Sequence, residues 1–345
     1  MSYPWLFGVR TDLAVFLGSA LLSLALLLVG AAMGILHSDS PEWIWVPAVL
    51  LIDVAHVWST IFRVYLDRDE VRRRPLVYWG IPVFAYGVGV LVYAQGPLWF
   101  WRAAAYLAVY HFVRQQYGWV ALYRRRANDT NRFDRILDTL TIYSVTIYTL
   151  LYCHAHLHQK YWWFVPHDFA VGLPVWVSQV AAPLYWSIVA GYLLRSIYRL
   201  VVLKTWNPGK DIVVVTTALC WYLGIVTFNS DYAFTVTNVL IHGVPYFALV
   251  YWYGRRRVQA GHGGAIRLLS HGPILFLAVL VLLAYGEELL WDRLIWHDRP
   301  WLFGGAWTWG QAATSLLVPL LALPQLTHYL LDGFIWRSRS NPEYR

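Results

Sequence analysis

The sequence VYHFVRQQYGWVALYRRR, residues 109–126, begins inside an apolar run and ends on three arginines. Such an ending predicts a helix that stops at a membrane surface, because basic residues gather on the cytoplasmic side of membrane proteins. His111, Arg114 and Gln115 interrupt the run where its flanks predict contact with lipid. Buried ionisable groups are costly in lipid and usually face the interior of a helix bundle. The stretch therefore predicts a spanning helix that carries part of a site inside the membrane.

The composition of the whole chain is that of a membrane protein. Of its 345 residues, 59% are hydrophobic and 13% are charged, whereas soluble domains contain about 25% charged residues. Aromatic residues make up 17% of the chain, and such rings favour the membrane–water boundary. The net charge of +8 does not indicate nucleic acid, because the basic residues lie in short loops between apolar segments. The two cysteines, Cys153 and Cys220, form no metal-binding motif.

Ten apolar segments are long enough to cross a bilayer, which takes about 20 residues each. No remaining segment is long enough for a soluble domain. We therefore predict an all-α fold, a polytopic integral membrane bundle of about ten transmembrane helices that occupies residues 1–345 as a single domain. The predicted helices are 12–36, 43–65, 76–95, 97–123, 137–157, 175–203, 211–229, 231–253, 272–290 and 306–335.

Lys and Arg in the short loops set the predicted orientation. With the N-terminus inside, the cytoplasmic segments hold 21 of these residues and the outer loops hold three. The N-terminal region has one arginine and no clear cleavage site, so we expect the first helix to remain uncleaved. Both termini are then cytoplasmic. We expect a multi-pass protein of the bacterial inner membrane.

Four histidines lie within even-numbered predicted helices, which all run from outside to inside. Each is 7 to 13 residues before the basic end of its helix, which corresponds to about 10–20 Å at 1.5 Å per residue. The four therefore share one layer between the bilayer midplane and the cytoplasmic surface. Independent histidines would not be expected to share a depth. These residues are His56, His111, His242 and His328.

Each of these histidines has a polar neighbour at helical spacing, which places the two side chains on one helix face. The pairs are Asp53–His56, His111–Gln115, Asn238–His242 and His328–Asp332. A carboxylate or amide at this spacing can be a metal ligand or can fix the imidazole tautomer. We therefore predict a metal site. Its predicted ligands are His56, His111, His242, His328, Asp53 and Asp332.

Arg114 and Gln115 are predicted to act in catalysis. Arg114 lies ten residues from Arg124, too deep to reach the surface easily, and could hold an anionic group by charge-assisted hydrogen bonds. Gln115 would orient a ligand. For any one histidine the alternative is structural, because a lone histidine in a membrane helix is more often a hydrogen-bond partner of another helix.

A second histidine cluster falls at the predicted outer surface. His154, His156 and His158 end the helix 137–157, and with His167 they could bind a metal. A wet interfacial helix end is the alternative for this cluster. Glu287 and Glu288 also lie near the outer end of their helix, where a specific role is not indicated.

Histidines on several helices near the cytoplasmic side resemble the ligand arrangement of integral-membrane, histidine-rich non-haem iron oxygenases and desaturases. The similarity concerns the class of ligand at a handful of positions. The HxxxH spacing of those families occurs here at His154–His158, on the predicted outer side, and their HxxHH box is absent. The resemblance implies non-haem iron and the oxidation or desaturation of a lipid.

The predicted function is that of a membrane-embedded, metal-dependent oxidoreductase acting on a lipid or isoprenoid. Imidazole and carboxylate ligands suit iron. The expected partners are the bilayer, the substrate and an electron-donor protein on the cytoplasmic side. A proton-coupled transporter is the first alternative, because intramembrane His, Asp and Arg also serve proton relays. Further alternatives are a haem b subunit with two axial histidines and a metal-free lipid transferase.

Overall fold

The computed structural model describes residues 3–156, 163–228 and 230–336. In this described part the chain is helical and has no strand, which confirms the predicted all-α class. Eight of its helices are long and apolar enough to cross a membrane. A ninth span is added if the bent pair α16 (Gln311–Leu321) and α17 (Leu323–Ile335) counts as one. These lengths and compositions are those of an integral membrane protein.

The eight spans coincide with eight of the predicted apolar segments, and their ends differ from the predicted ends by six residues at most. The agreement follows from apolar composition, which is a local property of the sequence. The spans are Val9–Met33, Glu42–Arg63, Pro75–Gln95, Arg132–Ala155, Val175–Leu203, Pro208–Thr227, Asp231–Gln259 and Pro273–Trp296.

The helix α8 (Pro97–Arg126) departs from this pattern. Its 30 residues span about 45 Å at 1.5 Å per residue, enough to cross a bilayer. It is not among the eight because polar residues such as Arg102, His111 and Arg114 lower its apolarity. The preceding Gly96 has φ +144°, a backbone conformation that favours glycine. The predicted count of ten spans thus depends on α8 and on the pair α16–α17.

Contacts between Cα atoms divide the chain into two compact units. Unit 1 comprises Met1–Ile44 and Phe112–Pro245, and unit 2 comprises Trp45–His111 and Tyr246–Arg345. Two of the boundaries fall inside long helices, α8 and α13 (Leu240–Gln259). The single domain predicted for residues 1–345 stays a prediction.

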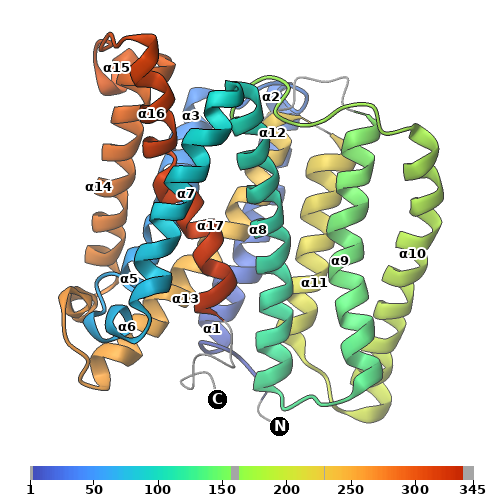
Figure 1. Cartoon of the computed structure of the whole chain (residues 1–345). Coiled ribbons are helices and arrows are strands. Elements are labelled where there is room, and N and C mark those ends of the chain that lie inside the picture. Colours follow the sequence, from blue (N-terminus) through green and yellow to red (C-terminus); the bar gives the residue numbers. More distant parts are fainter. Residues whose placement is uncertain (1–2, 157–162, 229, 337–345) are drawn as a thin grey trace. The chain divides into compact units, whose positions relative to one another are not determined.

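Unit 1 contains α9 and α10, which lie side by side in Figure 1 and pack against each other. The helix α11 packs on the other side of α9. Besides its parts of α8 and α13, the elements of unit 1 are α1 (Val9–Asp12), η1 (Leu13–Gly18), α2 (Ser19–Met33), α3 (Glu42–Ile44), α9 (Arg132–Ala155), α10 (Val175–Tyr198), η3 (Arg199–Leu203), α11 (Pro208–Trp221), η4 (Tyr222–Thr227), α12 (Asp231–Phe234) and η5 (Thr235–Val239).

Unit 2 packs α17 against α7, and α14 against α4. Its core includes Phe62, Val250 and Phe276, which are buried together. Besides its parts of α8 and α13, the elements of unit 2 are η2 (Trp45–Val54), α4 (Ala55–Trp58), α5 (Thr60–Arg63), α6 (Arg68–Arg73), α7 (Pro75–Gln95), η6 (Ala265–His271), α14 (Pro273–Trp291), η7 (Asp292–Trp296), α15 (Pro300–Phe303), α16 and α17.

Asp67 ties α13 to the start of α6 in unit 2. One carboxylate oxygen accepts the backbone N–H groups of Asp69 and Glu70 and so caps α6. Such a cap satisfies N–H groups that the first helical turn leaves without partners. The other oxygen accepts Arg257 Nε at 2.7 Å. Asp67 is fully buried and Arg257 nearly so, so each charge depends on the other for compensation.

Glu70 is the centre of a second buried ion cluster in unit 2. Arg63 Nη1 lies 3.2 Å from its carboxylate and Arg73 Nη2 lies 2.5 Å from it. The Tyr78 hydroxyl donates to the same oxygen. Burial would raise the pKa of Glu70, but the charge of Arg63 and the hydrogen bonds from Tyr78 and Arg73 outweigh it and lower the pKa. Arg63 also donates to the backbone oxygen of Ile335 on α17 at 2.8 Å.

The substitution Asp67→Ala should destabilise unit 2 strongly. It removes the cap of α6 and leaves the Arg257 guanidinium buried without its carboxylate, a loss of about 3–5 kcal/mol for a broken buried pair. Unfolding of the purified protein in detergent, followed by circular dichroism, measures the effect. Asp69→Ala is the matched control, because Asp69 is exposed and pairs with His262 at the surface, so its loss should change stability little. Equal effects of the two substitutions would contradict this assignment.

Glu70 also predicts a pH dependence of stability. A carboxylate with a lowered pKa in the folded state stabilises the fold above its ordinary value of 4.5, and this contribution disappears as the pH falls through the folded-state pKa. The melting temperature of the natural protein should therefore fall more steeply below pH 4.5 than that of Glu70→Gln. At neutral pH the variant should melt lower. Parallel pH profiles would show that Glu70 is not the group responsible.

Candidate metal centre

Three of the predicted histidine ligands lie in unit 2, on three different helices. His56 is on α4, His111 on α8 and His328 on α17. Their exposed fractions are 1%, 2% and 0%. The π-helical segment η2 ends directly before α4, and π-helical turns are frequent at functional sites.

The three imidazoles gather at one place in unit 2. His111 Nε2 and His328 Nε2 are 3.1 Å apart. The ring centroids of His56 and His328 are 5.0 Å apart. A ring nitrogen of His56 lies within 4.8 Å of one of His111. The fold of unit 2 therefore brings together histidines that are distant in the sequence.

The Nδ1 atom of each of these rings faces an oxygen atom. The three pairs are His111 Nδ1 with Asp332 Oδ2 at 3.4 Å, His328 Nδ1 with Thr60 Oγ1 at 2.7 Å, and His56 Nδ1 with Asp53 Oδ1 at 3.6 Å. Metal-binding histidines almost always present one ring nitrogen to the metal and the other to a carboxylate, carbonyl or water. For His111 and His328 this arrangement leaves the Nε2 atoms to act as ligands, because their Nδ1 atoms already have oxygen partners.

Asp332 is itself held in place by two donors of unit 2. The Tyr246 hydroxyl donates to Asp332 Oδ1 at 2.5 Å, and Trp336 Nε1 donates to the same oxygen at 3.1 Å. The other oxygen, Oδ2, is left to face His111. A carboxylate fixed in this way orients the imidazole and raises its basicity as a ligand.

The spacing of the two closest nitrogens fits a shared metal ion. Two nitrogens bonded at about 2.1 Å to one metal lie about 3.0 Å apart at right angles and about 3.4 Å apart in a tetrahedron. The 3.1 Å between His111 Nε2 and His328 Nε2 falls between these values. Asp53 and Asp332 supply carboxylates that could compensate a divalent charge. Without a metal, the same distance fits a hydrogen bond in which one imidazole donates to the other.

The remaining residues of the predicted site belong to unit 1. His242 is fully buried, and its ring stacks on that of Phe112 with centroids 3.7 Å apart. Gln115 donates from its amide to the backbone oxygen of His242 at 2.8 Å. Arg114 is exposed and donates to the Tyr143 hydroxyl. The predicted role of His242 as a ligand and the catalytic roles of Arg114 and Gln115 stay predictions.

The second histidine cluster is described only in part. His154 Nδ1 lies 2.7 Å from the backbone oxygen of Leu150, and His156 Nδ1 lies 2.8 Å from that of Tyr152. Each ring thus has a contact with its own helix. His158 lies outside the described residues, so the predicted HxxxH pair is not described.

Glu287 has a defined environment in unit 2. Its carboxylate accepts Trp58 Nε1 at 2.6 Å and Trp291 Nε1 at 3.4 Å. Glu287 is buried, and a buried carboxylate is stable only with such donors. The hydrogen bond from Trp58 therefore ties α4 to α14, which gives Glu287 a role in packing, whereas Trp291 lies on the same helix as Glu287.

Three site residues were not predicted from the sequence: Thr60, Tyr246 and Trp336. Thr60 follows His56 by four residues, and Trp336 follows Asp332 by four, so helical spacing could have found both. Tyr246 comes from α13, and its contact with Asp332 on α17 joins residues 86 apart in the chain. No local sequence pattern predicts a contact between such distant segments.

Comparison of the chain with protein-family models, curated proteins and solved structures found no match. No relative therefore assigns a role to any of the histidines. The functional argument that follows rests on the burial, distances and donor types within unit 2.

Protein purified in mild detergent without metal-affinity resin should contain a bound transition metal. His111→Ala and His328→Ala should each remove most of it, because each deletes one of two nitrogens 3.1 Å apart. Elemental analysis by mass spectrometry gives the content per chain. His271→Ala is the matched control, since His271 is an exposed histidine of unit 2. The same measurement on His242→Ala tests whether that residue is also a ligand. Equal metal content in all variants, or none in the natural protein, would exclude the metal centre.

Proposed function

We propose that this protein is a metal-dependent oxidoreductase embedded in the membrane. The observation that carries the proposal is the triad of buried imidazoles in unit 2, in which each Nδ1 atom faces an oxygen and the Nε2 atoms of His111 and His328 approach to 3.1 Å. Surface histidines have no need of such partners. Three neutral imidazoles and two carboxylates form a donor set that suits iron and other divalent first-row metals.

The metal we propose is non-haem iron. In haem b with two axial histidines, the ligand nitrogens lie on opposite sides of the iron, about 4 Å apart for bonds near 2 Å. The 3.1 Å between His111 Nε2 and His328 Nε2 matches neighbouring positions on one metal better than opposite ones. Soft metals prefer thiolate ligands, whereas the groups that gather in unit 2 are imidazoles and carboxylates.

The substrate we propose is a lipid or an isoprenoid, and the reaction is an oxidation, desaturation or oxidative cleavage. Iron bound in this site would supply redox chemistry with dioxygen, and an electron-donor protein on the cytoplasmic side would supply the electrons. The residues of unit 2 hold the imidazoles in fixed orientations. The apolar packing around α4 and α17 excludes water from them, and an apolar substrate dissolved in the bilayer could enter from the side.

The topology we propose has ten transmembrane helices with both termini in the cytoplasm of a bacterial cell, in its inner membrane. Eight apolar spans support it directly. The length of α8 and the bent pair α16–α17 would supply the other two. The strong excess of Lys and Arg on one set of loops supports the orientation.

A second candidate function is proton-coupled transport. It is favoured by a chain of hydrogen-bonding groups in unit 2 that runs from Thr60 through His328 and His111 to Asp332 and Tyr246. Such chains of intramembrane side chains can conduct protons. In this case the 3.1 Å pair is a hydrogen bond and no metal is needed.

Substitution of Asp332, the carboxylate that faces His111 Nδ1, distinguishes a metal site from a simple hydrogen-bond network. Asp332→Ala should weaken iron binding about 10–100-fold, the usual effect of losing such a supporting carboxylate, and Asp332→Asn should retain part of the affinity because its amide oxygen can still accept from His111. Titration of metal-free protein with Fe²⁺ under anaerobic conditions measures the affinity. Asp298→Ala is the control, because Asp298 is an exposed carboxylate of unit 2.

The same variants test the reaction. Lipid extracts of cells that produce the natural protein should contain oxidised or desaturated products by mass spectrometry, and cells with His328→Ala should not. The opposite result would favour the transporter. In that case the protein binds no metal and forms no product, but proteoliposomes show a proton flux driven by a pH gradient, and His328→Ala abolishes this flux.

A further inference from the structure

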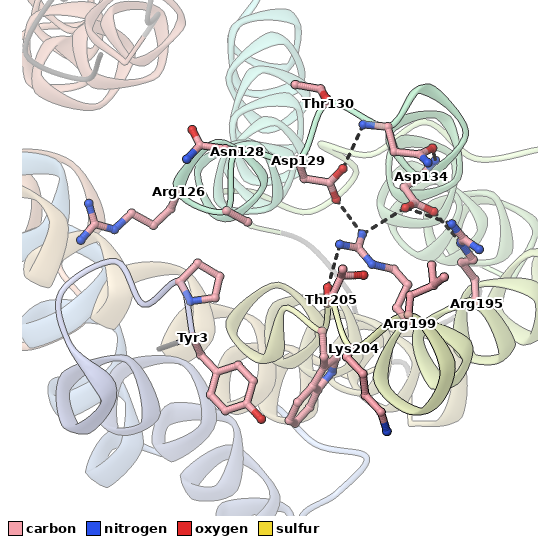
Figure 2. Close-up of a pocket in the computed structure, with 15 residues that line it drawn as sticks. Tyr3, Arg126, Asn128, Asp129, Thr130, Asp134, Arg195, Arg199, Lys204 and Thr205 are labelled. Atoms are coloured by element: carbon pink, nitrogen blue, oxygen red, sulfur yellow. Dashed lines mark hydrogen bonds and ion pairs between the residues drawn. The ribbon is translucent and has the colours of Figure 1, made fainter. Parts of the chain in front are cut away.

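A second polar site lies in unit 1, where its apolar helices end. A cavity of about 750 Å³ is bordered by the connection between α8 and α9, by the end of η3 and by the N-terminal segment. Figure 2 shows this cavity from close by. Four cationic side chains and two carboxylates line it: Arg126, Arg195, Arg199, Lys204, Asp129 and Asp134.

The two carboxylates of this cavity are matched by two of the guanidinium groups. Arg199 Nη1 lies 2.6 Å from Asp129 Oδ2 and 3.2 Å from Asp134 Oδ2. Arg195 Nε donates to Asp134 Oδ1 at 2.6 Å. Partial burial would raise the pKa of Asp129, but the hydrogen bond and charge of Arg199 and the charge of Arg124 outweigh it and lower the pKa. These charges therefore neutralise one another.

The other two cations have no such compensation. In the described part of the chain, neither Arg126 nor Lys204 forms an ion pair with a carboxylate; Arg126 Nε donates to the backbone oxygen of Trp5 at 3.2 Å. Both side chains are exposed, and in Figure 2 they extend away from the ion pairs of Arg199, to different sides of the residues drawn. Asn128 and Thr130 line the same cavity and can donate hydrogen bonds. The cavity thus presents two free positive charges and neutral donors.

The surface beside this cavity is apolar and exposed. On η3, Val201 and Val202 are 57% and 59% exposed, and on α9 Phe133 and Ile136 are 62% and 49% exposed. These residues belong to candidate membrane spans that end at the cavity. A soluble anion would use only the charges of the cavity. A phospholipid would use both parts, because its acyl chains can lie on the apolar surface while its phosphate reaches the cations.

We propose that this cavity binds the phosphodiester headgroup of an anionic phospholipid. Arg126 and Lys204, which border the cavity on different sides, attract its charge through space, and Asn128 and Thr130 can donate hydrogen bonds to its oxygens. The ion pairs of Arg199 hold the cavity open and rigid. The lipid is then a bound component of unit 1, independent of the chemistry proposed for the histidines of unit 2.

The test measures lipid-dependent thermal stability of the purified full chain in a neutral detergent. Phosphatidylglycerol is added in steps, with phosphatidylcholine and inorganic phosphate as the comparison probes. The variant Arg126→Gln/Lys204→Gln removes the two free cations. The matched control Arg72→Gln/Arg267→Gln makes the same change of charge at exposed arginines of unit 2.

Phosphatidylglycerol should raise the melting temperature of the natural protein and of the control, and phosphatidylcholine and phosphate should not. The cavity variant should melt normally without lipid but bind phosphatidylglycerol about 25-fold more weakly, since each basic side chain near an anionic lipid surface contributes about fivefold. Equal lipid response in both double variants would overturn the proposal. A shift as large with inorganic phosphate as with the lipid would also overturn it, in favour of a site for a soluble anion.

Discussion

The structure of unit 2 depends on one constraint: an imidazole buried among apolar helices needs a partner for each ring nitrogen. Thr60 and Asp332 meet this requirement at the Nδ1 atoms of His328 and His111, and Asp53 Oδ1 lies 3.6 Å from His56 Nδ1. These partners lie on the same helices as histidines of the triad, or within one turn of them. Each contact therefore restricts the rotation of a helix about its axis, and the Nε2 atoms of His111 and His328 lie 3.1 Å apart.

The ion clusters of unit 2 also fix the ends of the helices that carry the histidines. Arg63 follows Thr60 by three residues, and its guanidinium reaches both Glu70 and the last carbonyl of α17. That carbonyl belongs to Ile335, two helical turns beyond His328. The depth of His328 in the bundle and the charge balance around Glu70 are thus parts of one arrangement.

Much of this fold could be predicted from local sequence, because apolar length and helical spacing are local properties. The candidate spans coincide with apolar segments, and the pairing of Asp53 with His56 follows from a spacing of three. The roles of Tyr246 and Trp336 could not be predicted, because Tyr246 meets α17 through the tertiary fold alone and a tryptophan near a helix end usually indicates the membrane boundary. The equal depth of the histidines stays a prediction, and depth alone does not determine which helices are neighbours.

The polar character of α8 has a consequence for the way in which the protein enters its membrane. A helix with Arg102, His111, Arg114 and two glutamines along its length gains little from lipid by itself, since each charged group at mid-membrane costs about 2.5–3.5 kcal/mol. The apolar α7 precedes it across the tight turn at Gly96. Pairing with α7 would supply the hydrophobicity that α8 lacks by itself. The contact of His111 with Asp332 also requires α17, which follows α8 far along the chain, so this part of the site forms only after α17 has been synthesised.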